Sequence, residues 1–258
     1  MINSKIEWTG NTVNFWSGCQ KVSEGCKYCY MYRAKENNRV DPTKVVRASN
    51  FYFQSALSWN APTKIFTCSM SDFFIEDADQ WRAEAWDVIY KTPQHSWQVL
   101  TKRPERIKDC LPLNWANEGY SNVWLGVSIA CEAEKHRLKT LQELKNNESR
   151  FLTFLSVEPL IGDINFLDTT ENENYFKNLD WVIIGGESGN ADGKYRYRAC
   201  ELVWIENIIQ HCKKHGIAVF VKQVGTDLAK KMSLKDNYFG GNINEWPENI
   251  RVREFPKK

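Results

Sequence analysis

The sequence has no long apolar run. None of its hydrophobic stretches approaches the roughly 18 consecutive apolar residues of a membrane-spanning helix, and the N-terminal stretch MINSKIEWTG lacks the apolar core of a signal peptide. We therefore expect a cytoplasmic protein with no membrane partner. A charge excess is also missing, because 34 Lys and Arg stand against 32 Asp and Glu, for a net charge of +2. This balance neither demands nor excludes a nucleic-acid partner.

A disulfide framework is not expected among the eight cysteines, because a reducing compartment keeps thiols reduced. Clustered thiols there indicate metal binding or catalysis. Cys19, Cys26 and Cys29 form such a cluster, and no fourth cysteine follows until Cys68. None of the four histidines lies near the cluster in the sequence. The five scattered cysteines are typical of small, semi-buried side chains: Cys68, Cys110, Cys131, Cys200 and Cys212.

Three thiols fit two kinds of metal site. A structural zinc site needs four ligands, usually from paired knuckles, and this chain has one knuckle, Cys26-x-x-Cys29. Zinc would therefore need a distant fourth ligand. An iron–sulfur cluster held by three cysteines instead keeps one iron open for a substrate or cofactor. Three cysteines without a metal, in a reduced loop, are the remaining alternative.

Strand and helix patterns alternate along the chain. Seven apolar, β-branched stretches predict buried strands: 11–18, 64–69, 96–101, 122–129, 150–157, 181–186 and 218–223. Three intervening segments carry apolar residues on one helical face: 80–92, 132–146 and 201–216. This alternation predicts an α/β fold with a parallel sheet.

Polar or ionisable residues follow every predicted strand: Gly18-Cys19, then Ser69, Ser71 and Asp72, then Lys102-Arg103, Ser128, Glu158, Glu187-Ser188 and Lys222-Gln223. In a barrel all strands deliver side chains to one rim, whereas a doubly wound sheet does so only near its switch point. We therefore predict a single-domain parallel βα barrel, complete or partial and TIM-barrel-like. It would cover residues 1–225 with an insertion at 33–63, and an irregular C-terminal extension, 226–258, would pack on it.

The cysteine cluster resembles the radical SAM superfamily, whose usual motif is C-x3-C-x-aromatic-C. Cys26-Lys27-Tyr28-Cys29 matches the last four positions, while six residues, not three, separate the first two cysteines. Almost end to end, the chain resembles the phage- and prophage-associated three-Cys-motif family, which is radical-SAM-like and of unassigned function. The matching phrases are KIEWTG, SMSDFF, TPQHSWQVLTKRPER, WLGVSI, FLTFLSVEPL, DWVIIGGESG, FVKQVG and RVREFP. LTKRPE and VSI are also distantly similar to spore photoproduct lyase.

The resemblance implies a cofactor set. Cys19, Cys26 and Cys29 would ligate three irons of a 4Fe-4S cluster, and S-adenosylmethionine would chelate the fourth. The reduced cluster would cleave S-adenosylmethionine, and the resulting 5′-deoxyadenosyl radical would take hydrogen from an unidentified substrate. A nucleic acid or nucleotide is our hypothesis for that substrate. An electron donor such as flavodoxin or ferredoxin is also implied.

The polar residues after the strands are the candidates for cofactor binding: Ser69, Ser71, Asp72, Lys102, Ser128, Glu158 and Glu187. Ser69, Ser71 and Asp72 would accept the methionyl ammonium, unless Asp72 caps a helix beginning near Phe73. Glu158 would contact a ribose, or neutralise Lys102 or Lys222. The glycines before Glu187 would admit a ligand or form a tight turn.

No catalytic residue is identified. The candidates are Lys102, Glu187, Lys222 and Cys131. The three-Cys-motif pattern expects an acidic residue and Asn after GVSI, whereas this chain has Ala130-Cys131. A contact with the cofactor ribose would be altered if relatives make it at that position.

Three functions are therefore open. The charged strand ends favour a radical SAM enzyme. The wide first cysteine spacing and Ala130-Cys131 favour a metal-stabilised module, with iron–sulfur or zinc, that binds or regulates without catalysis. A zinc-dependent hydrolase or nuclease is disfavoured, because no histidine lies near the cysteines.

Overall fold

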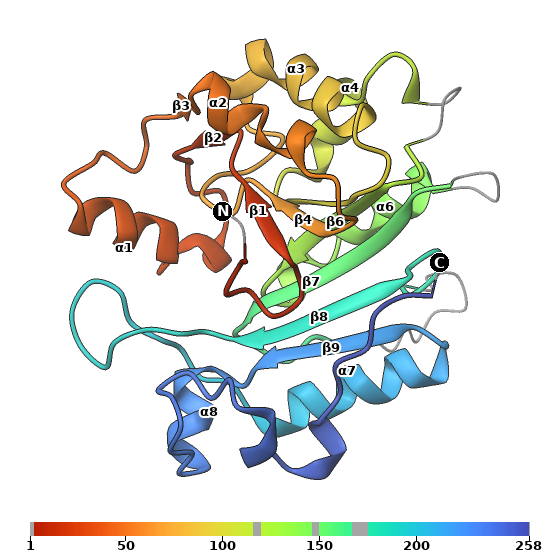
Figure 1. Ribbon diagram of the computed structural model, residues 1–258. Helices are drawn as coiled ribbons and strands as arrows, with labels where there is room; N and C mark the ends of the chain where they lie inside the picture. Colours follow the sequence, from red (N-terminus) through yellow and green to blue (C-terminus); the bar gives the residue numbers. More distant parts are fainter. Residues whose placement is uncertain (1–2, 116–119, 146–149, 167–174, 258) are drawn as a thin grey trace. The chain divides into compact units, whose positions relative to one another are not determined.

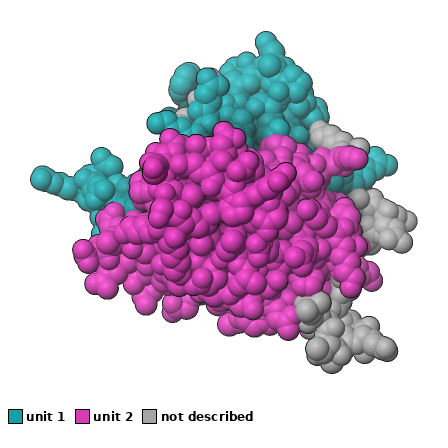
Figure 2. All heavy atoms as spheres, turned by 90° about the horizontal axis from the view of Figure 1, so that it is seen from below, with its two compact units in different colours: residues 1–22, 30–127, 144–153 teal, residues 23–29, 128–143, 154–258 magenta. Residues whose placement is uncertain are grey.

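The computed structural model describes residues 3–115, 120–145, 150–166 and 175–257. The chain forms two compact units, coloured separately in Figure 2. Unit 1 comprises Met1–Val22, Tyr30–Val127 and Leu144–Thr153. Unit 2 comprises Ser23–Cys29, Ser128–Glu143 and Phe154–Lys258. Whether the chain folds as the single predicted domain stays a prediction.

Seven strands follow one another in sequence order: β1 (Asn11–Val13), β4 (Lys64–Thr67), β5 (Ser96–Thr101), β6 (Val123–Ile129), β7 (Leu152–Leu160), β8 (Trp181–Gly186) and β9 (Ala218–Gln223). The pairs β1–β4, β4–β5 and β5–β6 are parallel, as are β7–β8 and β8–β9. The predicted α/β fold with parallel strands is confirmed. The order has no reversal of the kind that defines a doubly wound sheet.

The first predicted strand, 11–18, is wrong as a single element. β1 ends early, and β2 (Trp16–Ser17) instead pairs antiparallel with β3 (Val46–Arg47) of the insertion. The break lies at Asn14, whose side-chain oxygen accepts a hydrogen bond from the amide of Met70 at 2.9 Å. A side chain that bonds a neighbouring backbone in this way competes with the regular strand ladder.

Two of the three predicted helices are confirmed, as α3 (Asp79–Tyr90) and α7 (Leu202–Lys214). The third, 132–146, is too long at its start, because η5 (Glu132–Glu134) is a 3-10 turn and α6 (Arg137–Leu144) begins after it; residue 146 lies outside the described residues. Other α-helices among the described residues are α1 (Tyr30–Asn37), α2 (Asn50–Phe53), α4 (Ile107–Cys110) and α8 (Gly225–Lys231). Further 3-10 turns are η1 (Glu24–Cys26), η2 (Ser55–Ser58), η3 (Glu76–Ala78), η4 (Pro104–Arg106), η6 (Ile243–Glu245) and η7 (Glu248–Ile250). No helix in the described part of the chain is both long and apolar enough to cross a membrane.

Unit 1 has an aromatic core centred on Phe15. Its ring centroid lies 4.7 Å from that of Phe53, 5.8 Å from that of Trp97 and 6.3 Å from that of Phe73. All four side chains are fully buried. The core therefore joins the residue before β2 to α2, to β5 and to the loop after β4.

In unit 2, α7 runs along β9 (Figure 1) and buries Ile205, Ile208 and Ile209. The C-terminal extension returns to the same strand, where the amide of Val221 donates to Val252 O at 2.8 Å. This extension begins with α8 and continues through two 3-10 turns.

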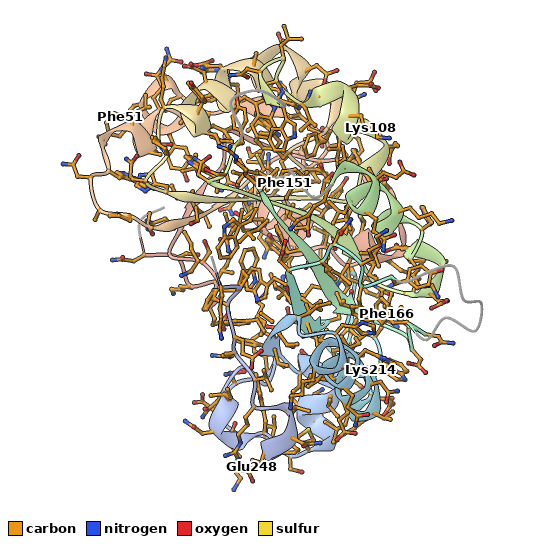
Figure 3. The ribbon with its side chains drawn as sticks, turned by 90° about the vertical axis from the view of Figure 1, so that its right-hand side faces the viewer. Phe51, Lys108, Phe151, Phe166, Lys214 and Glu248 are labelled. Carbon is orange, nitrogen blue, oxygen red and sulfur yellow. The ribbon has the colours of Figure 1, made fainter. Side chains whose placement is uncertain are left out.

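We expect Phe15→Ala to lower the free energy of unfolding by about 3–5 kcal/mol, because it removes a fully buried ring and leaves a cavity. Phe51→Ala is the matched control, since the side chain of Phe51 is 91% exposed (Figure 3). Urea denaturation followed by circular dichroism measures both. Equal losses in the two variants would contradict the assigned core.

Candidate functional site

The segment of unit 1 that carries Cys19, called the cysteine segment, begins at Gly18. Only glycine fits the backbone conformation and the close contact at this position. Gly18 has a φ of +106°, and a Cβ atom there would lie 2.1 Å from the carbonyl oxygen of Lys44. The amide of Gly18 donates to Met70 O at 3.0 Å, and its carbonyl accepts from Ser71 Oγ at 2.5 Å. The chain just before Cys19 is thus fixed to the loop that follows β4.

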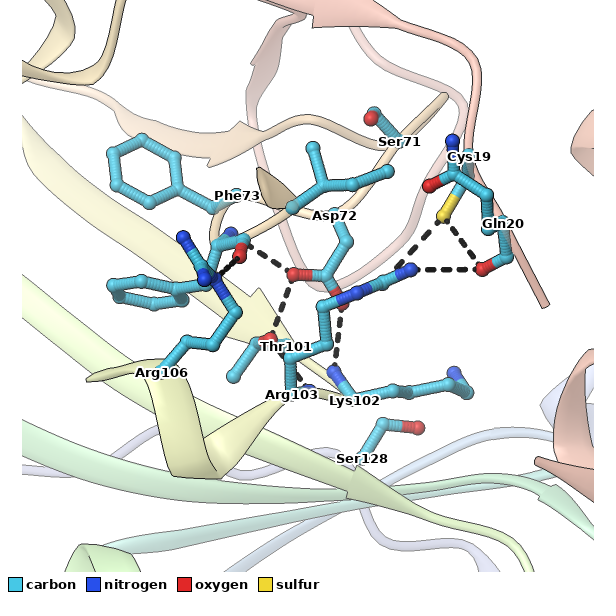
Figure 4. Close-up of polar contacts among 12 residues, drawn as sticks. Cys19, Gln20, Ser71, Asp72, Phe73, Thr101, Lys102, Arg103, Arg106 and Ser128 are labelled. Carbon is cyan, nitrogen blue, oxygen red and sulfur yellow. Dashed lines mark hydrogen bonds and ion pairs between the residues drawn. The ribbon is translucent and has the colours of Figure 1, made fainter. Parts of the chain in front are cut away.

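Asp72 is the hub of this region (Figure 4). Its Oδ1 accepts from Thr101 Oγ1 at 2.7 Å and from the amide of Phe74 at 2.9 Å. Its Oδ2 accepts from the amide of Lys102 at 2.8 Å and lies 3.2 Å from an Arg103 nitrogen. The carboxylate is buried, so these partners within the chain replace water around the charge and tie the ends of β4 and β5 together.

Arg103 carries that charge network to the cysteine segment. Its guanidinium pairs with Asp72, donates to Gln20 O at 2.9 Å and lies 3.7 Å from Cys19 Sγ. Burial alone would lower the pKa of Arg103, but the charges of Asp72 and Cys19 raise it above its ordinary value. A buried, permanently charged arginine therefore holds both the backbone and the sulfur of this segment.

The residues predicted to accept the methionyl ammonium gather at the carboxyl end of β4 and already have partners in unit 1. Ser69 Oγ donates to Asn14 Oδ1 at 3.1 Å, and Ser71 and Asp72 are bound as described above. The alternative that Asp72 caps a helix near Phe73 is wrong, because α3 begins at Asp79. Asp72 closes a turn instead. Its predicted cofactor contact stays a prediction.

Glu158 and Lys222 form an ion pair in unit 2, with Oε1 3.1 Å from Nζ. The carbonyl of Glu158 also accepts from Ser128 Oγ at 3.1 Å. A Cβ atom on Gly185 would lie 2.4 Å from Oε1 of Glu158. Of the two roles predicted for Glu158, the structure shows neutralisation of Lys222, and Gly185 makes room for that carboxylate.

Glu187 is buried and bound by a residue that the sequence did not single out. Arg198 donates to its carboxylate three times, from the amide at 2.9 Å, from Nε at 2.8 Å and from an η nitrogen at 2.6 Å. The preceding Gly186 is required because a Cβ atom would lie 2.2 Å from Val224 O. The Gly-Gly-Glu sequence therefore packs against this chain's own atoms.

Cys26 and Cys29 lie in unit 2, one turn apart. Cys26 ends η1, and the amide of Cys29 donates to Cys26 O at a long 3.4 Å. Ser23 Oγ lies 3.9 Å from Cys26 Sγ. Cys131, a candidate catalytic residue, is half-buried at the start of η5, and the amide of Ala130 beside it donates to Glu134 at 2.8 Å.

All eight cysteines lie in the described residues, and none of them forms a disulfide. Cys19, Cys26 and Cys29 are half-buried. Within the ranges that the structure describes, no three His, Cys, Asp or Glu side chains are grouped so that they could hold a metal ion. The metal-ligand role of the three thiols stays a prediction from their spacing and chemistry.

Comparison with known sequence families gives a match over most of the chain. The pattern of a family described as "Protein of unknown function (DUF5131)" matches residues 3–247. The chain belongs to the DUF5131 family. Neither a curated protein nor a solved structure matches it. The DUF5131 description assigns no activity, so the function has to be argued from the residues.

We expect Asp72→Ala to destabilise the protein by about 3–5 kcal/mol, because it leaves Arg103 buried without its carboxylate. Arg103→Met alone should also destabilise, and the double variant should lose much less than the sum of the two. Asp87→Ala is the control, because its ion pair with Lys91 is exposed and contributes little. Urea denaturation measures all four, and additive losses would contradict the coupling.

We also expect the thiols to differ in reactivity. Burial raises the pKa of Cys68 and Cys212, and that of Cys200 to about 12. At pH 8 these three are therefore protonated as well as covered, and iodoacetamide should label them only after unfolding. The half-buried thiols of the metal-free protein should react first: Cys19, Cys26, Cys29, Cys110 and Cys131. Peptide mass spectrometry at successive times measures the order in which the cysteines are labelled. Rapid labelling of Cys68 in the native protein would contradict the expected order.

Proposed function

We propose that this DUF5131 protein is a cytoplasmic radical-SAM-like enzyme on a parallel βα barrel, complete or partial. Cys19, Cys26 and Cys29 would hold a 4Fe-4S cluster, and S-adenosylmethionine would be the cofactor. When bound, such a cluster supplies the electron that cleaves the sulfonium and starts radical chemistry on the substrate.

The observation that carries the proposal is the place of the cysteine segment. Cys19 lies two residues after β2, beside the residues that follow β4 and β5, where Asp72 and Arg103 are buried. In parallel βα folds, functional groups gather at the carboxyl ends of the strands. The donor chemistry also fits, since the three thiols are half-buried and not in disulfides.

The chain's own residues support this role by holding the cysteine segment. Asp72 fixes Arg103, which binds Gln20 O beside Cys19. Lys102 and Lys222 add positive charge at strand ends for a carboxylate or phosphate group. We keep a nucleic acid or nucleotide as the proposed substrate class and flavodoxin or ferredoxin as the proposed electron donor.

A metal-stabilised module without catalysis is the second candidate. The observation that favours it is that the acids predicted to contact the cofactor are engaged within the chain. Asp72 pairs with Arg103, Glu158 with Lys222, and Glu187 with Arg198. Strand ends satisfied in this way can be purely structural.

Anaerobic purification followed by reconstitution with ferrous iron and sulfide tests the proposal. We expect about four irons per chain, and cleavage of S-adenosylmethionine when dithionite is added. Cys26→Ser should lose most of the iron and the cleavage. Cys212→Ser, in the buried face of α7, is the control and should keep both.

Four irons without cleavage of S-adenosylmethionine would favour the module. Stoichiometric zinc with no iron would contradict the proposal of a radical-SAM-like enzyme. Iron content and cleavage that are unchanged in Cys26→Ser would contradict the assigned ligands.

A further inference from the structure

Arg198 links a strand end of unit 2 to the segment that carries Cys26 and Cys29. On one side it makes three hydrogen bonds to Glu187, the first residue after β8. On the other side its second η nitrogen donates to Glu24 O at 3.0 Å. That carbonyl belongs to the first residue of η1, the turn that ends at Cys26.

The same guanidinium also lies over an aromatic ring in the segment that carries Cys26 and Cys29. Its central carbon is 5.3 Å from the ring centroid of Tyr28, the residue between Lys27 and Cys29. A half-buried arginine over a tyrosine face gains a further cation–π attraction. Burial alone would lower the pKa of Arg198, but its bonds to Glu187 raise it, so the charge persists.

The turn η1, which ends at Cys26, has few hydrogen bonds of its own to stabilise it. η1 is three residues long, and its internal bonds run from Cys26 N to Ser23 O at 2.9 Å and from Lys27 N to Glu24 O at 3.0 Å. A 3-10 turn of this length is too short to be stable alone. Its conformation therefore depends on contacts from outside, and Arg198 supplies one at its first residue, Glu24, and one at Tyr28, two residues beyond its end.

We propose that Arg198, held by Glu187, is the positioning residue of the Cys26-x-x-Cys29 turn. The inference rests on the proposed function in that the turn would hold a metal cluster. It gives Glu187 a role other than the predicted contact with the cofactor, because both carboxylate oxygens are used to orient the arginine. Metal affinity is sensitive to such residues behind the ligands.

The test compares metal-free wild-type protein with Arg198→Met, Arg198→Lys and a control, Arg196→Met. Arg196 is exposed on the same loop, and the hydrogen bond of its Nε goes to Gly193 O. Co²⁺ is titrated under anaerobic conditions, and the thiolate-to-cobalt charge-transfer absorbance reports binding. We expect Arg198→Met to weaken Co²⁺ binding about 10-fold, Arg198→Lys to fall between it and wild type, and Arg196→Met to bind as wild type.

Amide hydrogen exchange in the metal-free protein is the second readout. We expect the amides of Cys26 and Lys27 to exchange at least about 10-fold faster in Arg198→Met, because the turn opens locally at a smaller free-energy cost. Amides of α7 should be unchanged, which separates positioning from a general loss of stability.

Unchanged Co²⁺ affinity together with unchanged exchange in Arg198→Met would overturn the inference. Absence of the cobalt band in wild type would overturn the proposed metal site instead, while the exchange rates would still decide the role of Arg198. If Arg198→Met does not fold, Glu187→Gln takes its place. This variant keeps the side-chain volume but removes the charge, and wild-type values in it would overturn the inference.

Discussion

A carboxylate buried at the end of a strand must be surrounded by donors, because removal from water costs several kcal/mol for an unpaired charge. Asp72 meets this demand with Thr101, two backbone amides and Arg103. Each of these donors belongs to a segment that the carboxylate thereby fixes in space. The constraint reaches Cys19 because Arg103, which neutralises Asp72, also donates to Gln20 O next to it.

In unit 2, acidic side chains at strand ends are likewise paired with cations, supplied by different residues. Glu187 is surrounded by Arg198, and Glu158 pairs with Lys222. In each case the acid orients a cation. Arg198 then also binds the backbone of Glu24, in the segment that carries Cys26 and Cys29. At these strand ends each acid is paired with an arginine or a lysine, and Asp72 and Arg103 are both buried.

The strands could be predicted from the sequence because buried parallel strands read as apolar, β-branched runs, whatever their neighbours. The interruption of the first strand could not, since it depends on the side chain of Asn14 meeting Met70, 56 residues away. The late start of α6 has a local origin instead, because Glu134 accepts a hydrogen bond from the amide of Ala130, four residues earlier. No sequence pattern indicated a role for Arg198. Its bond to Glu24 spans 174 residues, and no local spacing rule connects two such positions.

The glycines of the Gly-Gly-Glu sequence are required by contacts within the chain, and the predicted contact of Glu187 with a cofactor stays a prediction. The glycines indicated close approach of another group, and such an approach exists. The approaching groups are Oε1 of Glu158 at Gly185 and the carbonyl of Val224 at Gly186. Both approaching groups belong to this chain. Glu187 is therefore enclosed by Arg198, while Lys222, although it pairs with Glu158, keeps 23% of its side chain exposed.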